Sequence, residues 1–277
     1  MDGKRRPFVG GRQPVRPRRF PALSLIITTA LTGALLSPVW GSQTRPSRPD
    51  RAGIDRSILD DPGRPADERA QDAGRKALQV YRWLGIRPGM TVADAFCSSG
   101  YNTHLLSRVV GDDGKVDAIF EFYADKEAFD GRLYKVDAVK ERIAKSKLNN
   151  VELFNKIADV PANSVNVVLA VRNYHDVEWV FHGATRKEIV AAMYRAVKPG
   201  GIVGIVEVAT DKPGWNKETH RLNERVVVED FTSGGFVLAG RSDMLANPDD
   251  DHSTNGFKQG RYKQDRYLLK FRKPPRN

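Results

Sequence analysis

Two short stretches of the chain carry polar side chains in an order that suits ligand binding and catalysis. Residues 91–103 alternate small and β-branched types, include the acid Asp94 and become amphipathic after Gly100. Residues 172–176, Arg-Asn-Tyr-His-Asp, follow a nearly all-apolar run. A guanidinium can bind an anion, an amide can orient a substrate, and an imidazole can take up a proton near neutral pH. These two stretches therefore contain the candidate binding and catalytic residues of the chain.

The first stretch has the pattern of a strand, a tight turn and a helix. Small residues in such a turn let the backbone come close to a ligand, and the free N–H groups of the helix face that ligand. Asp94, at the end of the strand, can accept hydrogen bonds from a hydroxyl or hold a cationic group. Cys97 is interpreted as a small residue that fills the bend, since a nucleophilic cysteine would need a base that the sequence does not reveal.

Further strands and helices must bring the two stretches together. We expect strands at residues 115–120, 151–154, 165–171, 202–208, from 236, and at 267–271, and helices at 67–84, 136–148, 187–197 and 218–231. The apolar strand 165–171 is of the kind that is buried on both faces of a sheet. Because ligands in open α/β sheets bind beyond the carboxyl ends of the strands, residues 172–176 are well placed to line a site.

The stretch around Asp94 resembles motif I of the class I S-adenosylmethionine-dependent methyltransferases, in which an acid is followed by alternating glycines. Asp94 takes the acidic place and Gly100 the last glycine place, while Phe96 and Ser98 stand where the two earlier glycines usually are. A branch of methyltransferases that often carry an export signal is similar in having aromatic residues at the places of Phe96 and Tyr101.

The second stretch extends this resemblance. Residues 172–175 are similar to the Arg-Asn-x-His segment that follows the fourth strand of the exported branch, and the likeness in order and spacing runs from about residue 64 to residue 273. It implies an α/β fold with a Rossmann-like, seven-stranded methyltransferase sheet, its last strand antiparallel, and helices on both faces. The Lys-Pro-Gly-Gly turn at residues 198–201 is a common methyltransferase feature before the fifth strand.

The resemblance implies S-adenosyl-L-methionine as the cofactor. The residues implied for its site are Asp94, Phe96, Ser98, Gly100, Tyr101 and Glu121. Asp94, Gly100 and Tyr101 would hold the amino-acid end of the cofactor. Glu121, near the end of the second strand, is the candidate for the ribose hydroxyls, because a carboxylate accepts on both oxygens. A solvated acid at the end of a strand is the alternative interpretation of Glu121.

The acceptor side is implied in the same way. Its candidate residues are His175, Arg172, Asn173 and Tyr174. His175 is the possible base, Arg172 could clamp a carboxylate or phosphate with its two-pronged geometry, and the other two could orient the acceptor. Alternatively, His175 caps a helix or forms hydrogen bonds with polar groups in the core. Arg172 could instead pair with an acid such as Asp72 or Asp265.

The net charge of +11 is concentrated near the start of the chain. Residues 1–41 contain seven basic residues and one acid, a net of +6, so the remaining residues carry +5. No basic stripe with interleaved aromatic residues follows, and nucleic-acid binding is therefore not expected. Cys97 is the only cysteine, which excludes an internal disulfide, and the spacing of the five histidines does not indicate a metal site.

The amino-terminal region has the pattern of an export signal. Residues 1–41 combine a basic start, an apolar run at residues 22–36 and small residues at plausible cleavage positions. The run is shorter than the ~20 residues that a membrane-spanning helix usually needs, so we interpret it as a signal peptide, with an uncleaved membrane anchor as the alternative. We expect residues 42–65 to form a flexible linker and residues 66–277 a methyltransferase-like domain. We expect this domain to be exported and periplasmic.

The expected function is methyl transfer from S-adenosylmethionine to an unidentified small-molecule or envelope acceptor. Because this cofactor is made in the cytosol, export favours one alternative, a catalytically inactive methyltransferase-fold binding module in the cell envelope. A nicotinamide-dependent oxidoreductase ranks lowest, since a Gly-x-Gly-x-x-Gly sequence is absent. The polar loop 249–261 is expected either to cover the site as a lid or to be a disordered insertion.

Overall fold

The computed structural model describes residues 53–121, 134–177, 185–255 and 262–276, all of them within the compact unit Ser47–Asn277. The predicted signal peptide lies outside the described residues, as do the first part of the predicted linker and residues 256–261 of the predicted lid. Among the described residues, no helix is both long enough and apolar enough to cross a membrane.

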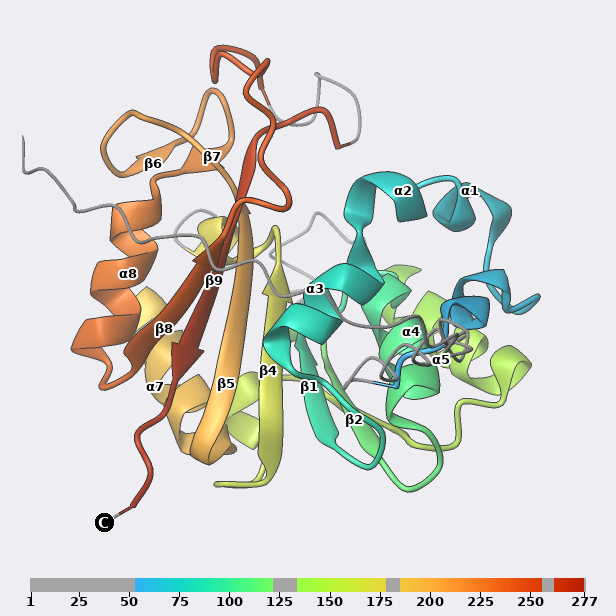
Figure 1. The fold of residues 1–277 in the computed structure, drawn as a ribbon. Coiled ribbons are helices and arrows are strands. Elements are labelled where there is room, and N and C mark those ends of the chain that lie inside the picture. The colour runs from blue at the N-terminus through green and yellow to red at the C-terminus, as the bar shows by residue number, and fades with distance from the viewer. Residues whose placement is uncertain (1–52, 122–133, 178–184, 256–261, 277) are drawn as a thin grey trace, which may run out of the picture. The chain divides into compact units, whose positions relative to one another are not determined.

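A seven-stranded sheet forms the centre of the described chain (Figure 1). Its order is β3-β2-β1-β4-β5-β9-β8, with parallel pairs from β3 to β5 and with β9 antiparallel to both of its neighbours. The strands are β1 (Thr91–Ala95), β2 (Lys115–Ile119), β3 (Val151–Phe154), β4 (Val165–Val171), β5 (Val197–Val208), β8 (Val237–Ser242) and β9 (Arg266–Arg272). The predicted fold class is confirmed.

The strand register brings the two candidate stretches to one edge of the sheet. β1 and β4 are parallel neighbours in which Asp94 lies opposite Leu169, and β4 and β5 are neighbours in which Val171 lies opposite Val206. Residues that follow β1, β4 and β5 therefore leave the sheet at its carboxyl edge. The strand order also reverses between β1 and β4, which is the place where open α/β sheets bind ligands.

Helices cover both faces of the sheet (Figure 1). They are α3 (Ala77–Leu84), α4 (Tyr101–Val110), α5 (Tyr134–Ser146), α7 (Arg186–Ala196) and α8 (Glu224–Ser233). Successive side chains of a strand point to opposite faces. Accordingly, Val92 of β1 packs in a cluster with residues of α3 and α4, whereas Ala93 packs in a second cluster with residues of α5, α7 and α8.

The segment before β1 differs from its prediction. The expected helix 67–84 is divided into α1 (Ala66–Arg69), α2 (Asp72–Arg75) and α3, because Lys76 has a φ of 52° and a left-handed residue cannot continue a helix. The predicted linker also does not extend to residue 65. Ile54 and Arg64 are buried, and the 3-10 helix η1 (Arg56–Asp60) lies between them.

The segments around β5 and α8 differ as well. β5 begins at Val197, before the Pro-Gly-Gly sequence that was expected to precede the strand. The helix expected at residues 218–231 begins only at Glu224, after the paired short strands β6 (Trp215–Asn216) and β7 (Arg221–Leu222). The guanidinium of Arg221 is fully buried and pairs with Asp250 at 2.9 Å. This ion pair fixes the segment that carries the neighbouring His220.

Candidate functional site

The carboxyl end of β1 turns sharply into α4. Phe96, Ser98 and Gly100 have φ angles of 60°, 52° and 82°, so every second residue of the turn is in the left-handed region. Glycine adopts this conformation without the steric penalty that a Cβ brings. At Gly100 an added Cβ would also lie 3.3 Å from Val139 Cγ2. The two residues that depart from the glycine pattern thus occupy backbone positions that favour glycine.

Asp94 is buried beneath this turn, with 1% of its surface exposed. The hydroxyl of Thr103 on α4 donates to its Oδ2 at 2.6 Å. Burial raises the pKa of Asp94 to about 7, although the hydrogen bonds from Thr103 act in the opposite direction. A cationic or hydroxyl-bearing ligand beside this carboxyl would favour its charged form.

Tyr101, the first residue of α4, faces the amino-terminal segment. Its hydroxyl donates to Asp72 Oδ1 at 2.6 Å, and the guanidinium carbon of Arg75 lies 3.9 Å from the centre of its ring. Asp72 also accepts two hydrogen bonds from Arg64, at 2.8 and 2.6 Å. These contacts attach α2 to the start of α4. The role of Tyr101 at the amino-acid end of a cofactor stays a prediction.

Glu121 follows β2 and is buried, with a φ of 50°. Its Oε2 accepts a hydrogen bond of 2.6 Å from the backbone N–H of Ile157, at the start of the 3-10 helix η3 (Ile157–Asp159). Burial raises the pKa of Glu121, and the hydrogen bond from Ile157 opposes this shift. Glu121 is therefore a packed acid and not a solvated one, while its predicted contact with a ribose stays untested.

The second stretch leaves β4 and forms the short 3-10 helix η4 (Tyr174–Asp176). Asn173 precedes η4, and its carbonyl accepts from the backbone N–H of Asp176 at 3.1 Å. The side chain of Tyr174 is fully buried, and its hydroxyl donates to Asp230 of α8 at 2.9 Å. Tyr174 thus attaches the end of β4 to α8. The acceptor-orienting roles of Asn173 and Tyr174 remain predictions.

His175 lies at the centre of a buried cluster of ionisable side chains. Its Nδ1 is 2.6 Å from Oε2 of Glu207 on β5, and its Nε2 is 2.6 Å from Nε2 of His220. Asp176 Oδ1 lies 3.3 Å from the Nε2 of His175 and 3.2 Å from that of His220. The other oxygen of Glu207 accepts from the backbone N–H of Tyr174 at 2.7 Å. We call His175, Asp176, Glu207 and His220 the histidine cluster.

The carboxylates of the histidine cluster determine the charge of His175. Burial by itself would lower the pKa of His175, but the negative charges of Glu207 and Asp176 outweigh it and raise the pKa to about 10. Burial would likewise raise the pKa of Asp176, but the charge of His175 holds it well below its usual range. His175 is therefore protonated at neutral pH in this arrangement, and an imidazolium cannot serve as a base. The predicted base role would require another protonation state.

Glu207 and His220 were not predicted as site residues, and Asp176 lay within the predicted stretch 172–176 without an assigned role. Glu207 and His220 are 32 and 45 residues away from His175, so no spacing rule connects them. One signal was present, since Glu207 is an acid within an otherwise apolar strand. The histidine spacing had indicated no metal site, yet ligand atoms of His175, Asp176 and His220 lie within 4.8 Å of one another.

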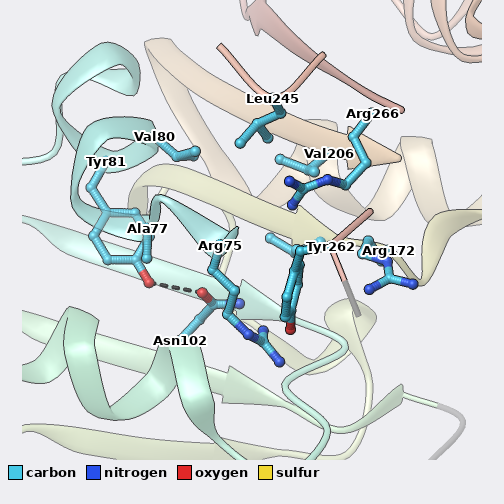
Figure 2. Close-up of a pocket in the computed structure, with 11 residues that line it drawn as sticks. Arg75, Ala77, Val80, Tyr81, Asn102, Arg172, Val206, Leu245, Tyr262 and Arg266 are labelled. Carbon is cyan, nitrogen blue, oxygen red and sulfur yellow. Dashed lines mark hydrogen bonds between the residues drawn. The ribbon is translucent and has the colours of Figure 1, made fainter. Parts of the chain in front are cut away.

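A small cavity of about 20 Å³ lies between α3 and the ends of β4 and β5 (Figure 2). Its described lining includes Arg172 and also Tyr81, Asn102, Arg75, Tyr262 and Arg266. The Tyr262 ring lies among three guanidinium groups, at 5.1 Å from Arg75, 5.8 Å from Arg172 and 5.3 Å from Arg266. Burial and the charge of Arg172 lower the pKa of Arg266 to about 10. An anion would relieve this repulsion between like charges.

The acids considered as partners of Arg172 have other contacts. Asp72 binds Arg64, as described above, and Asp265 accepts from the backbone N–H of Asn247 at 2.8 Å. Arg172 itself is placed beside the cavity by its φ of 58°, which turns the chain away from β4.

Several solved structures share the fold of this chain. A SAM-dependent methyltransferase from Aquifex aeolicus matches with a TM-score of 0.54 and 19% identity, over 79% of this chain and 98% of that one. The geranyl diphosphate C-methyltransferase of Streptomyces coelicolor matches with a TM-score of 0.54 and 12% identity, over 80% and 86%. This is the class I methyltransferase fold. The cyclase SpnF shares it, with a TM-score of 0.55 and 15% identity over 74% and 82% of the two chains, so the methyltransferase fold does not by itself define the reaction.

Sequence comparison also leads to methyltransferases. No family model matches the chain. The ubiquinone/menaquinone biosynthesis C-methyltransferase UbiE of Legionella pneumophila strain Lens is 30% identical over 128 residues, and that of strain Paris is 29% identical over the same length. Each match covers 45% of this chain and 45% of the relative, so the chain aligns with about half the length of these curated relatives.

Proposed function

We propose that this protein transfers a methyl group from S-adenosylmethionine to a small-molecule acceptor. The observation that carries the proposal is the buried Asp94 under a left-handed turn, at the strand-order reversal of a class I methyltransferase fold. The sulfonium of the donor activates its own methyl group. The protein must therefore hold donor and acceptor in line, and positioning of this kind supplies a large part of the rate.

The donor site is assigned to the turn after β1. Asp94, Gly100 and Tyr101 would hold the amino-acid end of the cofactor, and the positive end of the α4 dipole would lie toward its carboxylate. Glu121 would bind the ribose hydroxyls. The raised pKa of Asp94, about 7, supports a cationic or hydroxyl-bearing partner, because such a partner would offset the burial of its charge.

The acceptor we propose is a small molecule with an anionic group. Support comes from Arg75, Arg172 and Arg266, whose guanidinium groups surround Tyr262. A guanidinium binds a carboxylate or phosphate with two parallel hydrogen bonds. The cavity of about 20 Å³ is far smaller than a typical ligand pocket of about 300–1,000 Å³. Ligand binding would therefore displace side chains that fill it, Tyr262 first among them.

The test is calorimetric titration of the full-length chain with S-adenosylmethionine and S-adenosylhomocysteine. Micromolar binding is expected, and Asp94→Asn should weaken it at least about tenfold, since one charge-assisted hydrogen bond contributes about 1.5–3 kcal/mol. Asp117→Asn is the matched control, because this buried acid lies in β2 beside Lys115 and away from the turn. A folded chain that binds neither compound would refute the proposed activity.

A second candidate is a methyltransferase-fold binding module without catalytic activity. Two observations favour it, namely the small cavity beside Arg172 and the side chains of Phe96 and Ser98 at glycine-favouring positions. The two candidates differ in turnover. Transfer of label from methyl-labelled S-adenosylmethionine to a small-molecule extract of the producing cells would support the enzyme. Tight cofactor binding without transfer to any extract would support the module.

We also propose that the protein is exported, as in the signal-bearing branch that its motifs resemble. The support is the basic start of the chain followed by the apolar run at residues 22–36. Amino-terminal sequencing of the protein from the envelope fraction should find a new terminus near residue 42. Recovery of the intact chain only in the cytosol would refute export and leave the methyl-transfer proposal unaffected.

A further inference from the structure

Three potential ligand atoms converge beside the carboxyl end of β5. They are Nε2 of His175, Nε2 of His220 and a carboxylate oxygen of Asp176, and they lie within 4.8 Å of one another. His175 and Asp176 come from η4, whereas His220 comes from the segment that Arg221 and Asp250 anchor. All three residues are buried. Two imidazoles and a carboxylate form a donor set that divalent transition metals prefer.

The contacts within this group are incomplete without a cation. Asp176 Oδ1 is buried and has no hydrogen-bond partner among the described residues, although it lies 3.3 and 3.2 Å from the two Nε2 atoms. A buried carboxylate oxygen without such a partner is costly. The two Nε2 atoms are 2.6 Å apart, so only a proton shared between them keeps their lone pairs from facing each other. A metal ion in place of that proton would satisfy all three atoms.

The distances are close to those of a tetrahedral site. With metal–nitrogen and metal–oxygen bonds of about 2.0–2.2 Å, two ligands of a tetrahedral ion are about 3.3–3.5 Å apart. The distances from Asp176 Oδ1 to the two Nε2 atoms, 3.3 and 3.2 Å, are already close to this. The Nε2–Nε2 distance of 2.6 Å would have to open by about 0.7 Å when an ion binds.

Glu207 completes the arrangement from behind His175. Its Oε2 lies 2.6 Å from Nδ1 of His175, and the residue is fully buried. Histidine ligands of metals typically donate their other N–H to such a carboxylate, which fixes the ring and directs the second nitrogen toward the ion. Nitrogen donors disfavour Mg²⁺ and Ca²⁺, which take oxygen ligands. We propose that His175, His220 and Asp176 bind one divalent transition-metal ion such as Zn²⁺, with Glu207 as the positioning residue.

One side of the proposed ion would remain open. The side chains of Asp176 and His220 are 11% and 7% exposed, so solvent reaches the edge of the group. A site with three protein ligands keeps a fourth position for water or for an oxygen of a bound molecule. The proposal concerns metal binding and does not depend on methyl transfer.

The experiment uses the full-length chain, freed of metal with a chelator and then titrated with ZnCl₂ against a competing indicator. We expect one Zn²⁺ per chain by elemental analysis. His220→Ala should weaken binding by more than about 100-fold, and Glu207→Gln by about tenfold, since loss of an orienting partner typically costs 10–100-fold in metal affinity. His252→Ala is the matched control, because His252 lies 3.1 Å from the carboxylate of Asp265 but outside the histidine cluster. It should bind zinc like the unmodified chain.

Circular dichroism of each variant establishes that it is folded. If His220→Ala does not fold, the unmodified chain loaded with Co²⁺ serves instead, and it should show the visible absorption of a tetrahedral site with nitrogen and oxygen ligands. A folded unmodified chain that takes up no Zn²⁺ at micromolar concentration would overturn the proposal. Equal zinc affinity of folded His220→Ala and the unmodified chain would overturn it too.

Discussion

The turn after β1 and the histidine cluster after β4 lie at the same edge of the sheet but are built in different ways. Asp94 in the turn is bonded to Thr103, only nine residues later in the chain. His175 in the cluster is bonded to Glu207 and His220, which are 32 and 45 residues away. The turn is thus a local structure, and the cluster exists only because distant segments meet.

The two regions also differ in how their charges are balanced. Burial raises the pKa of Asp94, and its carboxyl accepts a hydrogen bond from the neutral hydroxyl of Thr103. In the histidine cluster, carboxylate oxygens of Glu207 and Asp176 lie 2.6–3.3 Å from imidazole nitrogens of His175 and His220. The buried carboxyl of Asp94 is thus held by hydrogen bonds from Thr103, whereas the charged members of the histidine cluster contact one another and stabilise that part of the fold.

The largest effect is expected when the cluster loses an anion. Glu207→Ala would leave the buried imidazolium of His175 and the backbone N–H of Tyr174 without their acceptor. Breaking a buried charge pair in this way costs about 3–5 kcal/mol. The free energy of unfolding of the full-length chain, measured with urea, should fall by this amount in the variant.

Glu224→Ala provides the control for this prediction. Glu224 pairs with Arg241, whose side chain is 58% exposed, and surface pairs contribute at most about 1 kcal/mol. If Glu207→Ala changed the free energy of unfolding no more than Glu224→Ala does, the contacts of Glu207 within the histidine cluster would not contribute to the stability of the fold.

The pH dependence of stability should show that ionisation of the buried Asp94 destabilises the fold. The pKa of Asp94 is about 7 in the folded chain and 3.8 as the reference for the unfolded chain. The folded state therefore binds more protons between these values, and its stability falls as the pH rises through them. Asp94→Asn keeps an acceptor for Thr103 and removes the titration.

When the pH rises from about 5 to about 8, we expect the free energy of unfolding of the unmodified chain to fall by about 2.5 kcal/mol more than that of Asp94→Asn, at about 1.4 kcal/mol per unit of pH up to the folded pKa of Asp94. Urea unfolding of both chains at several pH values measures the difference. Parallel stability curves for the two chains would show that Asp94 is already paired in the folded protein.

The same contrast explains what the sequence could predict. Strand and helix positions in 91–110 follow from local periodicity, and motif order was enough to predict the seven-stranded sheet. The break of helix 67–84 at Lys76 was not predicted, because the left-handed residue is a lysine, while the nearby Gly74 lies within α2 and does not itself end the helix. Glu207 and His220 could not be assigned to the site, since only the pairing of β4 with β5 and the buried pair Arg221–Asp250 bring them to His175.

A smaller effect is expected where the amino-terminal segment is attached to the turn. Tyr101→Phe removes the hydrogen bond from the hydroxyl to Asp72 and leaves the ring beneath Arg75. A hydrogen bond to a charged group contributes about 1.5–3 kcal/mol, and less here because Arg64 still pairs with Asp72. We expect the free energy of unfolding, measured with urea, to fall by about 1 kcal/mol in Tyr101→Phe. We also expect faster proteolysis within residues 53–76. Unchanged proteolysis would show that Arg75 and Arg64 hold the segment without the hydroxyl.

The smallest predicted effect concerns the backbone of the turn and has opposite signs at two neighbouring serines. Ser98 has a φ of 52°, whereas Ser99 is not among the positive-φ residues. Ser98→Gly should raise the free energy of unfolding by about 0.5–1 kcal/mol, because glycine removes the left-handed penalty. Ser99→Gly should lower it by a similar amount, about 0.5–1 kcal/mol, since glycine there only adds freedom to the unfolded chain.

Cofactor titration of the same two variants extends the test from stability to function. If the turn is a donor site, Ser98→Gly restores a glycine at the place where the motif usually has one, and S-adenosylmethionine should bind as tightly as before or more tightly. Two variants that shift stability in the same direction would show that the left-handed turn is not maintained in solution. In that case the turn after β1 would not be the strained local structure that distinguishes it from the histidine cluster.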